Sequence, residues 1–441
     1  MKQIKLNDNW EVCGVDFDEF LEVIKQLTKM TKCRKTSTAE MELLLSGYES
    51  RNFANTIRLT PELIKVLDEH LLDIITGSFD LDEMELPILE QKIESEYDPD
   101  LYRETFRESG FMMKEKEKCF YISRNALPSL FSRLKLGGEK MYNTNIVRNL
   151  LIGKMLYKQG IQAEDRAVFK NPEDTNTSIV YRELKEGEKT LRKIFFVPTD
   201  KYCPITLMVL PEIAEKICDD DILGDPDIQY WRVNHDIAEI VITFPAIAEE
   251  TASAYTKLPD EVLPGVLIRT SDTGKSCVDV KAVAFVGRSH HYITLETSKR
   301  KHTGEVTSDE IVNEANEVVL RNVRVLPELL ANLTENVIYE PGVTKDVSVV
   351  RKAISKTILY CGLTKVLGKK REKDLKTGLF AEINEERVYT QYDIAAMIMK
   401  ISDRIADIPQ YMRDQLGEAC AKAPFAFKEA DEEELYLMPE E

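Results

Sequence analysis

Residues 264–304 constrain the fold of this chain more than any other segment. Two apolar-rich runs flank the tetrapeptide Ser271-Asp272-Thr273-Gly274, and Asp and Gly are residues that turns prefer. Apolar runs on both sides of such a turn predict an antiparallel β hairpin over residues 266–286. This hairpin is expected to belong to a central, antiparallel, β-rich core.

Two neighbouring runs in the middle third have the pattern of further strands. Residues 193–198 predict a short strand. Over residues 238–244 apolar residues recur at every second position until Pro245 ends the run, which is typical of a strand. The turn-forming residues Asn234-His235-Asp236 stand before this run, so a second hairpin is expected there.

The first third carries helix signals. Asp16 and Glu19 resemble a capping box ahead of an apolar helical stripe. Thr60-Pro61 is a good start for a second helix, which stops at Gly77, and a third helix is predicted over residues 145–159. Residues 80–108 are acidic with little periodicity, so we interpret them as a connector or variable insertion.

Helices are also predicted after the β-rich region. Thr307 and Glu310 form another capping box. Isoleucines at spacings of three or four predict a last helix over residues 394–408, which Pro409 should end or kink.

These patterns together predict an α+β protein with four parts. A helical N-terminal region covers residues 1–110, and a central α+β core with β hairpins covers residues 111–305. A helical C-terminal region covers residues 306–430. An acidic tail, residues 431–441, carries too much like charge to pack.

Composition narrows the class of protein. The chain has 441 residues and a formal net charge of −18 at pH 7, which disfavours a general coat on duplex DNA but allows a local basic groove. The sequence indicates neither a signal peptide nor an apolar run of membrane-spanning length. The eight cysteines form no C-x-x-C pair, so zinc ribbons are poorly supported. We expect reduced thiols, a cytoplasmic setting, no membrane contact, and no cofactor or metal.

A basic strip that follows the β turn is the best candidate for a binding surface. In an acidic chain, a local reversal of charge is where binding is expected. Aromatic residues lie between the cations, as base stacking on single-stranded nucleic acid requires. The candidate binding residues are Arg269, Lys275, Lys281, Arg288, His291, Tyr292, Lys299, Arg300, Lys301, His302 and Arg321.

Ion pairing is the alternative interpretation of this basic strip. Residues 219–261 hold eleven Asp or Glu against only Arg232 and Lys257. The cations can therefore pair with this acidic segment of their own chain, or with a neighbouring subunit.

The turn also carries fragments of two enzyme motifs. Thr273-Gly274-Lys275-Ser276 resembles the end of a phosphate-binding loop, but Arg269 stands where that loop needs glycine, and a strand is expected to follow. Asp272-Thr273-Gly274 matches the aspartic-protease triplet, whose chemistry needs a second facing carboxylate. An ordinary hairpin turn is favoured over both, and no catalytic residue is assigned.

Acidic and histidine clusters are interpreted in the same way. The acidic run that starts at Asp219 could bind a hard cation, but the ligand pattern of a calcium loop is incomplete. His290, His291 and His302 could supply a base or metal ligands. Adjacent residues of a strand point to opposite faces, so His290 and His291 cannot both serve one pocket. A solvated loop and structural or surface histidines are favoured.

Three short segments resemble a known family in their order along the chain. They are a strand and turn with a Tyr-x-Pro element at 196–205, a Gly-led strand running into a Ser-acid-x-Gly turn at 264–274, and a basic-His-x-Gly element at 300–304. In these segments the chain is similar to the phage/plasmid-like proteins built around a widespread domain of unknown function. Ser289-His290-His291-Tyr292 replaces the Cys-Thr-Asn-Gly of that family. The resemblance implies a mobile-element protein of a bacterial host and brings no catalytic residues.

The leading hypothesis is a non-enzymatic binding or assembly protein that uses the basic strip and either self-associates or binds a protein partner. An accessory protein that binds or anneals single-stranded nucleic acid is one alternative. A structural component of a virion or shell is another, and a hydrolase that uses His291 or His302 is the last.

Overall fold

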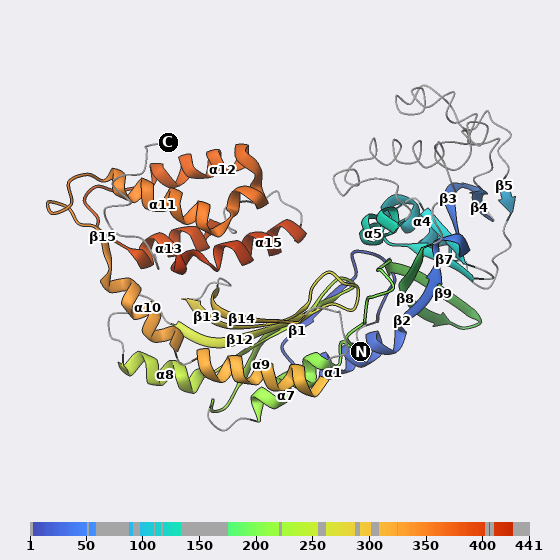
Figure 1. Cartoon of the computed structure of the whole chain (residues 1–441), viewed down its shortest axis with the longest axis horizontal. Helices are drawn as coiled ribbons and strands as arrows, with labels where there is room; N and C mark the ends of the chain where they lie inside the picture. Colours follow the sequence, from blue (N-terminus) through green and yellow to red (C-terminus); the bar gives the residue numbers. More distant parts are fainter. Residues whose placement is uncertain are drawn as a thin grey trace.

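The computed structural model confirms an α+β protein, with helices towards both ends and β sheets between them (Figure 1). It describes residues 3–50, 53–58, 88–90, 98–109, 111–115, 118–133, 175–219, 223–254, 262–286, 292–300, 308–323, 325–401, 405 and 410–426. The helices predicted over residues 60–77 and 145–159, and the acidic tail, lie outside these ranges. Within them, no helix combines the length and apolar character that crossing a membrane requires.

An antiparallel six-stranded sheet contains both predicted hairpins. β12 (Val262–Thr270) pairs with β13 (Val278–Val286), and Gly274 lies in the turn between them with a φ of 71°. β10 (Asp227–Asn234) pairs with β11 (Ala238–Thr243) across the predicted turn at His235. Both hairpin predictions are therefore confirmed. The strand order is β1-β10-β11-β12-β13-β14, with β1 (Glu11–Gly14) and β14 (Tyr292–Arg300) at the edges.

A second sheet of eight strands has the order β2-β8-β9-β7-β6-β3-β4-β5. The strand predicted at residues 193–198 is the end of β9 (Lys189–Phe196), which pairs with β8 (Asn176–Glu186). Neighbouring strands of this sheet run antiparallel, except β7 and β9, which run parallel to each other. The remaining strands are β2 (Thr31–Ser37), β3 (Met41–Ser50), β4 (Phe53–Arg58), β5 (Ile88–Glu90), β6 (Phe111–Glu115) and β7 (Lys118–Ile122).

The N-terminal third contributes strands that the sequence analysis does not predict. β2 has the sequence TKCRKTS, and its polar residues occupy both faces, so no alternating apolar pattern marks it. The prediction of a connector over residues 80–108 is wrong for the part that the structure describes, because β5 and α4 (Pro99–Glu108) lie there. Asp98 begins α4 by accepting a hydrogen bond from the Leu101 N–H over 2.9 Å, a capping signal that the acidic composition conceals.

Helices cover one face of the six-stranded sheet, where α7 (Val209–Cys218), α8 (Pro245–Ala254) and α9 (Ser308–Asn322) lie (Figure 1). α1 (Phe17–Met30) begins at the predicted cap, where Asp16 accepts a hydrogen bond from the Glu19 N–H over 2.7 Å. α9 begins at Ser308, and the predicted capping residue Thr307 lies outside the described residues. α10 (Val325–Glu335) follows α9, and α5 (Leu127–Arg133) belongs to the region of the second sheet.

The C-terminal helices lie on the opposite face of the six-stranded sheet (Figure 1). They are α11 (Ser348–Cys361), α12 (Leu363–Ala381), α13 (Gln391–Met399) and α15 (Gln410–Cys420), with a short ladder of β15 (Val337–Tyr339) and β16 (Tyr389–Thr390) beside them. The last predicted helix, over residues 394–408, is confirmed in its first part. A capping box of Thr390 and Asp393 begins α13 three residues earlier than predicted, and α13 ends at Met399. Among the described residues, short 3₁₀ helices cover Thr38–Glu40, Arg124–Ala126 and Ala423–Phe425.

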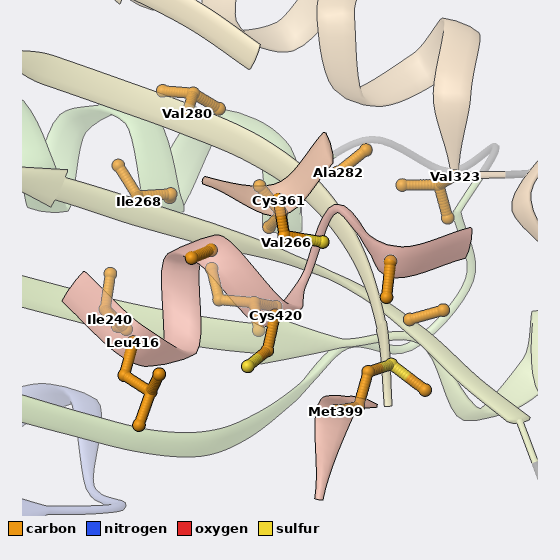
Figure 2. Packing of buried hydrophobic residues seen from close by; sticks show 14 of the residues in the cluster. Ile240, Val266, Ile268, Val280, Ala282, Val323, Cys361, Met399, Leu416 and Cys420 are labelled. Carbon is orange, nitrogen blue, oxygen red and sulfur yellow. The ribbon is translucent and has the colours of Figure 1, made fainter. Parts of the chain in front are cut away.

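One large hydrophobic cluster links the sheet to the helices on both sides (Figure 2). Ile240 and Val280 come from the strands, Val323 follows α9, and Leu416 and Cys420 come from α15. Their side chains are buried, and burial of apolar area is the main force that holds the layers together. The C-terminal helices are therefore packed onto the sheet as part of one core.

Candidate functional site

The structure brings two residues of the predicted basic strip together and pairs both with acids. Arg269 of β12 lies 2.7 Å from a carboxylate oxygen of Glu239 in β11 and 2.5 Å from one of Glu418 in α15. Lys281 of β13 lies 3.3 Å from the same Glu418 oxygen and 3.0 Å from Asp279. Both cations are buried. Because Glu239 belongs to the acidic segment of the middle third, pairing inside the chain accounts for Arg269.

Of the other strip residues with described side chains, Tyr292 lies near the Arg269–Glu239–Glu418 group, whereas Lys275 and Arg321 lie apart from it. Lys275 is exposed in the β12–β13 turn, and its Nζ donates a hydrogen bond to the Asn125 carbonyl over 3.0 Å. Arg321 is exposed on α9, which covers the face of the sheet opposite to α15 and its Glu418 (Figure 1). The structure therefore does not bring Arg269, Lys275 and Arg321 into one surface.

β14 carries three further residues of the strip. Lys299 and Arg300 stand at its end, and Tyr292 stands at its start. The rings of Tyr292 and Phe285 are 6.1 Å apart, and burial raises the pKa of the Tyr292 phenol. The remaining candidates, together with His290, lie outside the described residues; they are Arg288, His291, Lys301 and His302.

A buried polar cluster connects the two sheets, and we call it the polar joint. It consists of Arg182 in β8, His235 in the β10–β11 turn and Asp272 in the β12–β13 turn. Arg182 Nη2 donates a hydrogen bond to Asp272 Oδ1 over 2.8 Å, and Nη1 donates to His235 Nδ1. Thr31 Oγ1 donates to Asp272 Oδ2 over 2.7 Å. Both oxygens of the carboxylate therefore have partners.

Both ring nitrogens of His235 are occupied. Nε2 lies 2.8 Å from the carbonyl oxygen of Lys5, which can only accept, so Nε2 carries the proton and Nδ1 accepts from Arg182. The rings of Trp10 and Phe195 lie 5.0 and 4.2 Å from the imidazole. Burial, and secondarily the charge of Arg182, holds the pKa of His235 well below its usual value. The imidazole is therefore neutral.

Contacts from the second sheet and the residues after it hold the β12–β13 turn in place. The Tyr202 hydroxyl donates a hydrogen bond to the carbonyl of Asp272 over 2.9 Å. A Cβ atom at Gly274 would stand 2.4 Å from the ring of Phe196 in β9. This close approach and the positive φ both require glycine at this position.

The enzyme-like fragments of the turn do not assemble a catalytic pair among the described residues. The Asp272 carboxylate binds Arg182 and Thr31, whereas a protease dyad shares its proton with a second carboxylate. A strand, β13, follows Ser276 as expected. In the part of the chain that the structure describes, no group of three or more His, Cys, Asp or Glu residues is placed to hold a metal ion.

A strongly cationic surface lies on α11 and α12, residues 348–381, which we call the basic helical pair. These residues include nine Lys or Arg against two acids, in a chain whose net charge is −18. This surface is not among the sites predicted from the sequence, because no motif marks its cations. A count of charges over a window of about 35 residues would have found it. The exposed cations are Arg351, Lys365, Lys369, Lys370, Arg371 and Lys373.

Scans against protein-family models, curated proteins and solved structures each find no match to this chain. The features that bear on its function are the polar joint, the paired cations of the β sheet and the basic helical pair.

Proposed function

We propose that this chain is a non-enzymatic binding and assembly protein of a phage or plasmid, acting in the cytoplasm of the bacterial host. The observation that carries the proposal is the segregation of charge. The basic helical pair holds nine cations and two acids while the whole chain has a net charge of −18. Such a surface attracts anionic partners and orients them as they approach.

The polar joint supports a role without catalysis. A general base needs a ring nitrogen or carboxylate within reach of a substrate proton. In the joint, His235 uses both nitrogens and Asp272 uses both oxygens to bind residues of the protein. These groups therefore connect the sheets, and they are not available to a substrate.

The phage or plasmid origin rests on the family resemblance, and two of the segments that carry this resemblance touch each other. Tyr202 belongs to the first segment, and its hydroxyl binds the Asp272 carbonyl in the second. Phe196 of the first segment also lies against Gly274 of the second. Residues that form one structural unit are a better basis for a resemblance than isolated matches.

Assembly follows from the same charge distribution. A second copy of the chain offers acidic surface to the basic helical pair, so self-association and binding of another anionic partner use the same cations. Salt should weaken both, because exposed charges are screened over about 10 Å at 0.1 M ionic strength.

The test compares the wild-type chain with two variants of equal charge. The helical-pair variant carries Lys→Gln changes at Lys365, Lys369, Lys370 and Lys373. The control variant carries the same change at four exposed lysines elsewhere, Lys25, Lys29, Lys185 and Lys216.

Affinity purification from bacteria that carry the phage or plasmid, with and without nuclease, identifies the partners of each variant. Light scattering after size exclusion reports their assembly. We expect the helical-pair variant to lose its partners or its assembly while the control variant keeps them. Equal behaviour of the two variants would reject the proposal.

A further inference from the structure

We infer that the basic helical pair binds single-stranded nucleic acid, with its cations on the phosphates and Tyr360 stacked on a base. This inference names the partner in the proposed function and rests on it. Four features of the helices support it: their position, their pattern of charge, the place of the cations in α12, and an exposed apolar tip.

The basic helical pair forms the outer layer of the C-terminal region. α13 and α15 lie between it and the six-stranded sheet (Figure 1). α11 packs on α13, and α12 packs on α15, through faces that bury Ile354, Ile358 and Leu379. The cationic faces of both helices are therefore directed away from the core, where a long ligand can lie across them.

The charges of α12 are mostly of one sign. Lys365 is exposed before the interruption at Gly368, and four exposed cations follow it: Lys369, Lys370, Arg371 and Lys373. Lys369 and Lys373 stand at positions i and i+4, where like charges destabilise a helix. Lys370 with Asp374, and Glu372 with Lys376, stand at the same spacing with opposite charges and offset part of this repulsion. An extended polyanion is the ligand that would relieve the repulsion that remains.

The position of the cations within α12 also argues against a purely structural role. Gly368 interrupts the helix with φ of 76° and ψ of 158°, and the next three residues are Lys369, Lys370 and Arg371. Cations at the start of a helical segment oppose the helix dipole and lower its stability. Folding alone therefore does not account for three cations there. Glu372 offsets part of the charge through a 3.1 Å ion pair with Lys376.

Two exposed apolar side chains stand at the end of α11, close in the sequence to the cations of α12. Leu359 is 70% exposed and Tyr360 is 53% exposed, at the end of α11. Gly362, with φ of 70°, turns the chain directly into α12, so Tyr360 lies only five residues before Lys365. An exposed aromatic ring beside phosphate-binding cations is the arrangement that stacks unpaired bases. Duplex DNA offers no free base face, so Tyr360 favours a single strand.

Fluorescence anisotropy of a labelled oligo-dT of about 20 nucleotides, longer than the typical site of single-strand binding folds, tests this inference on the full chain. The helical-pair variant should bind at least about tenfold more weakly than wild type. It should also show a smaller dependence of affinity on salt, because each phosphate contact contributes to that slope. The control variant should match wild type. Circular dichroism and thermal unfolding verify that all variants fold.

Tyr360→Ala separates stacking from charge. It should lower affinity for oligo-dT by about fivefold or more while leaving the salt dependence unchanged. Affinity for a duplex of equal length should not change. A Tyr360→Ala variant that binds oligo-dT as well as wild type, or a wild-type chain that prefers the duplex, would overturn the single-strand assignment.

The outcome also distinguishes this inference from the proposed function. Suppose the wild-type chain does not bind either nucleic acid, but a protein partner is purified with it and lost from the helical-pair variant. The nucleic-acid inference is then overturned while the binding function stands. Loss of oligo-dT binding in the control variant to the same extent would overturn the inference as well, because the effect would then reflect net charge.

Discussion

Arg182 and Asp272 form a buried ion pair that joins the two sheets, with Arg182 Nη2 donating to Asp272 Oδ1 over 2.8 Å. Arg182 belongs to β8 of the eight-stranded sheet, and Asp272 belongs to the β12–β13 turn of the six-stranded sheet. Their side chains are 1% and 6% exposed. A pair this deeply buried is costly to break, because either partner left alone keeps its charge away from water.

We therefore expect Arg182→Met to lower the free energy of unfolding by about 3–5 kcal/mol, the usual cost of removing one partner of a buried ion pair. Urea unfolding followed by circular dichroism measures this loss. Arg192→Met serves as a control on the neighbouring strand, because Arg192 pairs with Glu183 nearer the surface. It should cost about 1 kcal/mol or less. If the two variants lost the same free energy of unfolding, the pair of Arg182 with Asp272 would stabilise the protein no more than a pair near the surface.

His235 makes the stability of the protein depend on pH. Because burial holds the pKa of His235 well below 6.5 in the folded state, the unfolded chain binds a proton there that the folded chain does not. This contribution to stability is fully present above pH 6.5 and is lost as the pH falls towards the lower, folded-state pKa. The protonation of His235 in the unfolded chain should therefore lower the wild-type free energy of unfolding as the pH falls from about 7 to about 5.

The variant His235→Gln isolates this component. Burial raises the pKa of Asp236 and Glu108, so these groups favour the folded state at low pH and lose that effect as the pH rises. Both groups remain in the variant, and their contributions cancel when the two pH profiles are subtracted. The difference between wild type and variant should shrink as the pH falls from 7 to 5. A difference that is constant over this range would contradict the assignment.

The sequence predicts the hairpins because their signals are local. The β12–β13 hairpin has two apolar runs and a turn with Asp272 and Gly274, and the β10–β11 hairpin has alternating residues after Asn234. The α1 cap at Asp16 is local in the same way. Such patterns depend on the residues of the turn and on the spacing of apolar residues, and both can be recognised within a short stretch of sequence.

The candidate sites could be predicted less well, because they depend on contacts between distant segments. The pairing of Arg269 with Glu418 joins residues 149 positions apart, and the bond of Arg182 to Asp272 spans 90 positions. A count of charges recognises a basic segment but does not show whether its cations are paired with acids of the same chain. The basic helical pair is the exception, since its excess of Lys and Arg is visible in the sequence itself.

Gly274 and Gly187 provide a matched test of the sheet contact. Both have a positive φ, of 71° and 62°, so alanine at either position costs about 1 kcal/mol for the backbone conformation alone. A Cβ at Gly187 meets nothing within 4 Å, whereas one at Gly274 would stand 2.4 Å from the Phe196 ring. Gly274→Ala should therefore destabilise the protein by about 1–3 kcal/mol more than Gly187→Ala.

Thermal or urea unfolding measures both glycine variants, and a second substitution identifies the cause of the difference. Phe196→Leu should cost less in the Gly274→Ala background than in the wild type, because the smaller side chain leaves room for the new methyl group. If Gly274→Ala and Gly187→Ala lose equal stability, the turn does not depend on its contact with β9.

Glu418 connects α15 to the central sheet through two ion pairs, because its Oε1 lies 2.5 Å from Arg269 and 3.3 Å from Lys281. Its side chain is 38% exposed, and Glu239 and Asp279 still pair with the two cations when it is neutralised. Glu418→Gln should therefore cost only about 1 kcal/mol of global stability. Hydrogen exchange should accelerate in residues 410–420 while the strands β11–β13 remain protected.

Glu239→Gln gives the opposite pattern, because Glu239 is buried and binds both Arg269 and Arg232. Neutralising it leaves Arg269 with Glu418 and Arg232 with a more distant Glu11, 3.8 Å away, as their remaining partners. Because Glu239 loses two charged hydrogen bonds in a buried place, global stability should fall by about 1.5–3 kcal/mol. Exchange should then rise in β10–β12 as well as in α15. If Glu418→Gln destabilised the strands as much as Glu239→Gln does, the expectation would be wrong. The stability of the strands would then depend on the carboxylate of α15 as much as on Glu239.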